Sequence, residues 1–264
     1  GFKTNRWFEI CRYECRLRSI TVLELIMNQH KTSTQLKALA KESLMGKYGV
    51  VVGASLLYIL ITYVITEISA IFLVVPGIVG TILYYLSIFA ITVFTGIFAY
   101  GFNFLFLKVS CNAPVKINDL FYGFSTHTKE ILKAQLFRSA ISYVTCIPCY
   151  VFNELVSKEQ MTNYIGIYFL LFGLGLLGQF IVMLLYNQTF FIMLDFPDYD
   201  AKKALAFSRE LMKGNKGRFI YLMVSFIPLF LLGMLSCCVG YLWIVPYMQA
   251  TLAHFYLDLV QNKN

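Results

Sequence analysis

The stretch KALAFSRELMKGNKGRF, residues 203–219, lies between two long apolar blocks. A second stretch, KALAKESLMGKYG at residues 37–49, resembles it. Both begin with KALA, contain a Leu-Met pair, end in a cluster of glycine and lysine, and run directly into an apolar block. The match requires two one-residue gaps. It predicts a repeated unit made of an amphipathic helix, a glycine stop and a membrane helix.

The composition is that of a membrane protein. The chain has 264 residues, of which 58% are hydrophobic and only 14% are charged, whereas a soluble domain carries about 25% charged residues. These few polar side chains could not cover the apolar surface, so the chain must lie in lipid. A net charge of +8 then indicates cytoplasmic loops that face anionic lipid, and it does not indicate a nucleic-acid partner.

Residues 1–26 differ from the rest of the chain. They contain no methionine, mix both signs of charge and lack the apolar core of a signal peptide. Two interpretations remain open: the chain is a fragment without its true start, or synthesis begins at Met27. We favour the second, because the repeat begins soon after Met27. We assign no function to residues 1–26 and expect residues 27–264 to form a single membrane domain.

Six apolar segments are long enough to cross a bilayer, and short connections join them in pairs. The sequence therefore predicts an all-α bundle of six spans in three hairpins. The expected spans are residues 48–73, 81–107, 134–155, 164–194, 219–235 and 239–259. Two amphipathic helices, one before the first span and one before the fifth, should lie in the plane of the membrane surface.

The basic residues predict the orientation of these spans. With the N-terminus inside, the inner segments hold 16 Lys and Arg, the outer connections hold only Lys158, and the other five lie in residues 1–26. The positive-inside rule then places both termini in the cytoplasm. Both repeat units also lie on the cytoplasmic side. Such a parallel repeat differs from the inverted repeats of many secondary transporters.

The C-terminal third resembles a bacterial family known as domain of unknown function 975. Four motifs carry the resemblance: Ser208-Arg-Glu-Leu-Met-Lys-Gly-Asn-Lys, Leu242-Trp-Ile-Val-Pro-Tyr, Thr251-x-Ala-x-Phe-Tyr-x-Asp-Leu259 and, near the N-terminus, Lys41-x-x-Leu-x-Gly-Lys-Tyr-Gly. The similarity extends over roughly residues 30–260. It implies a multi-pass protein of the bacterial plasma membrane with no assigned reaction.

Two glycine motifs favour helix packing. Gly173, Gly175 and Gly178 match a dinucleotide-binding fingerprint, but that fingerprint requires a preceding strand and a solvent-facing helix start. Here the three glycines fall in the middle of a span, where small residues allow helices to approach closely. Gly49 and Gly53 in the first span have the spacing of a packing motif as well.

The cysteines allow two interpretations. Cys146 and Cys149 resemble a redox dithiol, yet they lie within a span and not at the exposed start of a soluble helix. Together with Cys237 and Cys238 they could form a disulfide near the outer face. Alternatively they are small apolar residues inside the bundle, which we favour. None of the seven cysteines has a metal-site spacing with the three histidines.

The functional candidates fall into two sets. A polar set in the inner and middle parts of the spans could line a cavity open to the cytoplasm or form hydrogen bonds between helices: Asn103, Gln179, Asn187, Gln188, Gln249 and His254. A basic set could bind lipid headgroups or a membrane partner, or could simply anchor the topology: Lys202, Lys203, Arg209, Lys213, Lys216 and Arg218.

No nucleophile–base pair, metal motif or phosphate loop accompanies these residues, so we predict neither an enzyme nor a cofactor. We favour a non-enzymatic membrane module that binds anionic lipid of the bilayer, or a membrane protein, through its basic helices. The alternative is a transporter or permease subunit for a small or lipidic solute that uses the polar set.

Overall fold

The computed structural model describes residues 30–75, 77–156, 164–236 and 239–262. Within these ranges every regular element is a helix, which confirms the all-α prediction. The N-terminal extension, residues 1–26, lies outside the described residues. The elements are α2 (Ser33–Leu44), α3 (Tyr48–Ile68), η1 (Ser69–Val74), α4 (Ile78–Ser110), η2 (Ile117–Phe121), α5 (Tyr122–Ser125), α6 (Thr128–Leu155), α7 (Ile165–Tyr186), α8 (Thr189–Asp195), α9 (Ala201–Leu211), α10 (Lys216–Val224), α11 (Ile227–Leu235) and α12 (Tyr241–Gln261).

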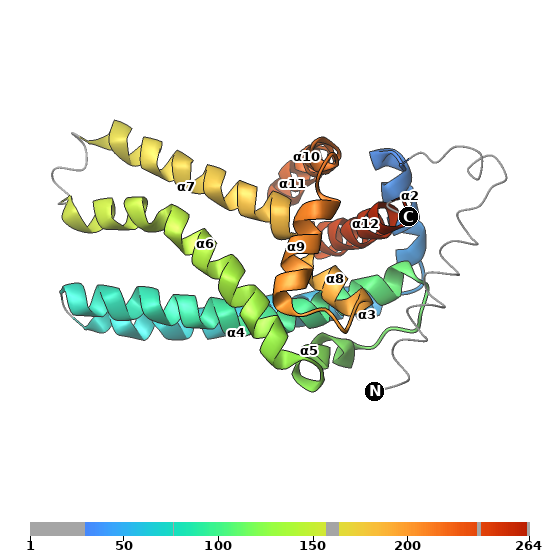
Figure 1. The fold of residues 1–264 in the computed structure, drawn as a ribbon, viewed down its shortest axis with the longest axis horizontal. Coiled ribbons are helices and arrows are strands. Elements are labelled where there is room, and N and C mark those ends of the chain that lie inside the picture. Colours follow the sequence, from blue (N-terminus) through green and yellow to red (C-terminus); the bar gives the residue numbers. More distant parts are fainter. Residues whose placement is uncertain (1–29, 76, 157–163, 237–238, 263–264) are drawn as a thin grey trace.

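Two helical hairpins form long arms. In Figure 1 the α3–α4 turn lies at the same end of the molecule as the end of α6 and the start of α7. Helix α2 and the C-terminus lie toward the opposite end. The arms follow directly from the long apolar runs in the sequence, which form helices because only a helix satisfies all backbone groups within its own segment.

Four segments are long and apolar enough to cross a membrane: Tyr48–Phe72, Ile78–Ser110, Ile165–Asp195 and Lys216–Leu235. The other two predicted spans are present as helices α6 and α12, but neither contains an apolar window of the required length within the described residues. In α6, Lys133 and Arg138 interrupt the apolar sequence, and in α12 His254 and Asp258 do. The six-span arrangement therefore stays a prediction.

The arms expose apolar side chains over most of their surface. Leu60 of α3, Ile78 of α4 and Leu170 of α7 are 59%, 69% and 64% exposed. A soluble monomer rarely leaves large contiguous apolar patches uncovered. This surface is compatible with a membrane protein, because lipid chains would cover it.

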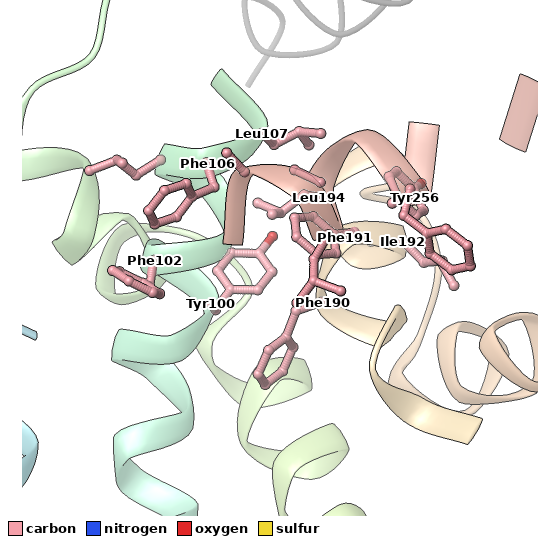
Figure 2. Close-up of a cluster of buried hydrophobic side chains, with 14 of the residues drawn as sticks. Tyr100, Phe102, Phe106, Leu107, Phe190, Phe191, Ile192, Leu194 and Tyr256 are labelled. Atoms are coloured by element: carbon pink, nitrogen blue, oxygen red, sulfur yellow. The ribbon is translucent and has the colours of Figure 1, made fainter. Parts of the chain in front are cut away.

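The core lies where α4, α8 and α12 meet (Figure 2). Tyr256 of α12 stacks on Phe191 of α8 with ring centroids 5.4 Å apart, and its hydroxyl donates a 2.9 Å hydrogen bond to Asp195. On the other side, the hydroxyl of Tyr100 donates to the Met193 carbonyl at 3.5 Å. These contacts fix α8, a short helix that continues the α7 arm after a break at Asn187 and Gln188.

The packing role predicted for the mid-span glycines is confirmed at one of them. A Cβ on Gly178 would clash with Thr145 of α6, so this glycine lets α6 and α7 approach. A Cβ on Gly175 would make only an ordinary van der Waals contact with Cys146, and one on Gly173 would face open space. For Gly49 and Gly53 the packing role stays a prediction: within this chain Gly49 faces open space, and a Cβ on Gly53 would make only an ordinary contact with Ile117.

Three further glycines also allow close approaches. A Cβ on Gly96 would meet Gln135 of α6, one on Gly101 would meet the Leu120 carbonyl, and one on Gly123 would meet the Ile97 carbonyl. They bring η2, α5 and α6 against α4. The loop after α4 is therefore folded back onto that helix.

Candidate functional site

Helix α9 is attached to the bundle along one side. Ala204, Leu205, Ser208 and Leu211 are buried, as the sequence predicts. The Ser208 hydroxyl donates a 2.8 Å hydrogen bond to the Leu185 carbonyl of α7. These contacts leave the opposite side of the helix free to carry charge.

Glu130 of α6 fixes the start of α9. One of its oxygens accepts a 3.0 Å hydrogen bond from the backbone N–H of Ala201, and the other accepts a 2.6 Å hydrogen bond from the Lys133 ammonium. The hydrogen bond from Lys133 and the Ala201 amide lower the pKa of Glu130 from its ordinary value. A carboxylate at this position also stabilises the helix dipole of α9.

Five of the six predicted basic residues are exposed in and just after α9. We call this set the α9 basic face: Lys202, Lys203, Arg209, Lys213 and Lys216. Lys202 and Arg209 are seven residues apart and therefore share one side of the helix. Acidic residues also lie nearby, since Asp198, Asp200 and Glu210 are exposed.

The sixth basic residue, Arg218, lies in a different environment. It is half-buried and donates hydrogen bonds to Asp258 of α12 at 2.7 Å, to the Lys31 carbonyl at 2.8 Å and to Asn215 at 3.0 Å. The Lys31 amide donates to the other Asp258 oxygen at 3.0 Å. Arg218 is thus bound internally and is not available as part of the exposed face.

The predicted polar set is divided among several interfaces. Gln179 of α7 bonds to Ser142 of α6 through both its amide atoms, and His254 of α12 lies 3.2 Å from the Ser43 hydroxyl of α2. Asn103 donates to the Ala99 carbonyl in its own helix at 2.7 Å. Gln179 and His254 therefore form hydrogen bonds between helices.

Two other members of that set lie at the break between α7 and α8. Gln188 is fully buried, and neither of its amide atoms has a hydrogen-bond partner in the described part of the chain. Asn187 also has a buried, unpartnered side-chain nitrogen there. Gln249 lies half-buried on α12.

A cavity of about 250 Å³ lies between α4, α6 and α7. Its lining includes Tyr85, Cys146, Cys149, Tyr150 and Gln179. Cys146 and Cys149 carry free thiols, while Cys237 and Cys238 lie outside the described residues. Within the described ranges, no group of three His, Cys, Asp or Glu residues is placed to hold a metal ion.

The two glycine stops have the same geometry. Gly46 and Gly214 both have φ +78°, a conformation that favours glycine. After each of them, one backbone N–H bonds to the carbonyl of Leu44 or Met212, at 3.0 and 3.2 Å. The next helix begins two residues after each glycine, at Tyr48 and Lys216.

This geometry corrects the alignment of the two stretches. When Gly46 is matched with Gly214, no gap is needed, and Glu42 aligns with Glu210 and Gly49 with Gly217. The buried positions also coincide in the pairs Leu36/Ala204, Ala40/Ser208, Ser43/Leu211 and Leu44/Met212. In this alignment the two KALA tetrapeptides are offset by two residues. They have the same sequence, but their equivalent residues do not occupy equivalent buried positions.

Comparison with known families gives one match. The family described as "Protein of unknown function (DUF975)" matches residues 27–263. The chain belongs to the DUF975 family. Searches of curated proteins and of solved structures found no significant match.

The motifs that resemble DUF975 lie at structural junctions. The motif that begins at Ser208 contains the Gly214 stop, and the motif that ends at Leu259 contains Asp258, which binds Arg218. In this DUF975 protein both motifs therefore contribute to holding α9, α10 and α12 together.

Proposed function

We propose that this DUF975 protein is a non-enzymatic membrane module that binds anionic lipid headgroups through the α9 basic face. The observation that carries the proposal is that one side of α9 is buried against the protein while its basic residues are exposed. Its apolar side contacts α6, α7 and α8, while the five cationic residues of the α9 basic face are exposed. A cationic helix held beside membrane segments is suited to lie among headgroups.

The proposal includes a topology. α6 and α12 would cross the bilayer with the four apolar segments, giving six spans of a bacterial plasma membrane with both termini in the cytoplasm. In Figure 1 the end of α6 and the start of α7 lie at the same end of the molecule as the end of α3 and the start of α4, which supports this arrangement. The matched stops at Gly46 and Gly214 support a parallel repeat, in which α2 and α9 are the two interfacial helices.

The strength of the attraction can be bounded. Each Lys or Arg near an anionic membrane surface contributes about 1 kcal/mol. The nearby Asp198, Asp200 and Glu210 oppose the five cations, so the net attraction should be well below about 5 kcal/mol. It should also weaken with salt.

A permease that uses the polar set is the less supported alternative. Gln179 and His254 are already hydrogen-bonded at two separate helix interfaces. Asn103 is satisfied within α4. A shared cavity for a solute would need these side chains to converge, which this arrangement does not favour.

The proposal is tested by measuring lipid retention on the full chain. Native mass spectrometry would compare phosphatidylglycerol with phosphatidylcholine added to the detergent-solubilised protein. The triple variant Lys202→Gln, Lys203→Gln and Lys213→Gln should lose the preference for phosphatidylglycerol. The control changes two exposed lysines outside the two interfacial helices, Lys116 and Lys129, and should keep it. Equal loss in both variants would show a general charge effect and reject the α9 basic face.

A further inference from the structure

Within the described residues, Arg138 of α6 is a charged side chain without an anionic partner. Its Nε atom is buried and has no hydrogen-bond partner in the described part of the chain. The ion pairs found there join Arg218 to Asp258, Lys108 to Asp119 and Lys133 to Glu130. A buried and unpaired charge is unfavourable, and in a membrane segment such a residue commonly marks a functional site.

The guanidinium lies between three helices. Its central carbon is 5.0 Å from the ring centroid of Phe190 of α8, and Tyr58 of α3 is close enough to interact with it electrostatically. Tyr58 is held in place by stacking on Phe102, with centroids 4.5 Å apart. In Figure 2 the Phe190 ring projects from α8 away from Phe191.

Among the residues that the structure describes, no carboxylate is placed to neutralise Arg138. Helices α4 and α7 contain no acidic residue. Glu130 binds Lys133 and the amide of Ala201, and Asp195 accepts the Tyr256 hydroxyl. Glu67 and Glu154 belong to the far ends of α3 and α6.

Other hydrogen-bond donors lie close to Phe190 in the chain. Asn187 precedes it by three residues, at the break between α7 and α8, and the Asn187 side-chain nitrogen is buried without a partner in the described part of the chain. The fully buried Gln188 and Thr189 also have unpartnered side-chain atoms. Buried polar atoms normally have partners, so this concentration of unpartnered atoms requires an explanation.

We propose that Arg138, together with the Asn187 amide and the Tyr58 hydroxyl, forms a buried receptor for a phosphate-type oxyanion. A guanidinium can bind two oxygens of such an anion at once, and the amide and hydroxyl supply further donors. The anion is either the phosphate of a bound phospholipid or a soluble phosphate. The receptor residues belong to α3, α6 and the α7–α8 break, whereas the α9 basic face belongs to α9 and the residues just after it, so the two sites use different residues.

If Arg138 has a purely structural role, its substitution should have a different effect from the one expected for an anion receptor. If its only role is to stack on Phe190, then Arg138→Met should destabilise the protein equally with and without an anion. If it is an anion receptor, the variant should lose its response to the anion. The two roles can therefore be separated by the response to ligand, whatever the basal stability of the variant.

The first experiment measures thermal unfolding of the delipidated full chain as inorganic phosphate replaces chloride at constant ionic strength. Phosphate should raise the Tm of the unmodified protein and leave that of Arg138→Met unchanged. Tyr58→Phe removes a single hydroxyl and should weaken the apparent phosphate affinity by about tenfold. Lys129→Met, which changes an exposed lysine on the same helix, should respond like the unmodified protein.

The second experiment distinguishes the source of the anion by native mass spectrometry of the protein released from membranes. A phospholipid that is absent from Arg138→Met and retained by Lys129→Met and by the α9 triple variant would identify a lipid headgroup. A phosphate response without such a lipid would identify a soluble anion. If neither measurement depends on Arg138, the receptor is rejected. Should Arg138→Met fail to fold, unchanged phosphate affinity in both Tyr58→Phe and Asn187→Leu would reject it equally.

Discussion

Arg218 of α10 and Asp258 of α12 form a 2.7 Å ion pair, and the Asp258 side chain is only 2% exposed. The same carboxylate accepts the backbone N–H of Lys31 just before α2. One buried acid therefore joins the segment before the first described helix, the start of α10 and the end of the last helix. Its position explains why a residue of the C-terminal motif matters for the arrangement of distant segments.

Asp258→Asn should destabilise the protein, because it leaves the half-buried Arg218 without its counter-charge. Breaking a buried pair costs about 3–5 kcal/mol, and the partial exposure of Arg218 should reduce this to about 2–3 kcal/mol. Denaturant unfolding in detergent micelles measures the change. The double variant Asp258→Asn with Arg218→Met should recover part of the loss, and no recovery would mean that the pair does not act as a unit.

The glycine stops should be sensitive to substitution. Gly46→Ala and Gly214→Ala place a Cβ on a backbone with φ +78°, which should cost about 1–2 kcal/mol each. Gly49→Ala and Gly217→Ala are matched controls, because both glycines face open space and neither has a positive φ. Thermal unfolding of the four variants provides the comparison. Similar effects for stops and controls would contradict the conformational argument.

The position of most helices could be predicted from hydropathy alone. The expected span 81–107 corresponds to α4, Ile78–Ser110, because a long apolar run has few alternatives to a helix. Breaks inside such runs were missed. The expected span 219–235 divides into α10 and α11 just before Pro228, where proline removes a backbone donor and thereby gives a signal in the sequence.

The candidate site was less predictable, because it depends on pairs that are distant in the chain. Nothing in the sequence indicates that Arg218 binds Asp258 whereas Lys216, two residues earlier, stays exposed. In the sequence Arg138 is one more basic residue of the inner segments, since its lack of a carboxylate partner among the described residues becomes visible only when the neighbouring helices are placed. The side of α9 that is buried was predictable, because it follows from helical periodicity.

Close packing of α6 against α7 should depend on Gly178. Gly178→Ala introduces a methyl group that would clash with Thr145, and overpacking of this kind typically costs about 1–3 kcal/mol. Gly173→Ala on the same helix is the control, since nothing lies within contact distance. Unfolding in detergent should show a loss for the first variant only. A similar loss in both would point to helix flexibility instead of packing.

The hydrogen bond between Glu130 and the Ala201 amide at the start of α9 should make the stability of the protein depend on pH. The pKa of Glu130 is lowered in the folded protein by its hydrogen bonds to Lys133 and the Ala201 amide. Its ionised form therefore stabilises the fold above the ordinary pKa of 4.5. This contribution is lost as the pH falls through the lowered folded value.

Glu130→Gln should accordingly reduce stability at neutral pH by about 1 kcal/mol or less, since the site is partly exposed. The difference between the variant and the unmodified protein should shrink as the pH falls below about 4.5. Unfolding free energies measured across this range provide the test, with Lys129→Gln as a control that should show no such trend. A constant difference at all pH values would mean that the charge of Glu130 does not stabilise the start of α9, and that only its shape and hydrogen-bonding capacity matter there.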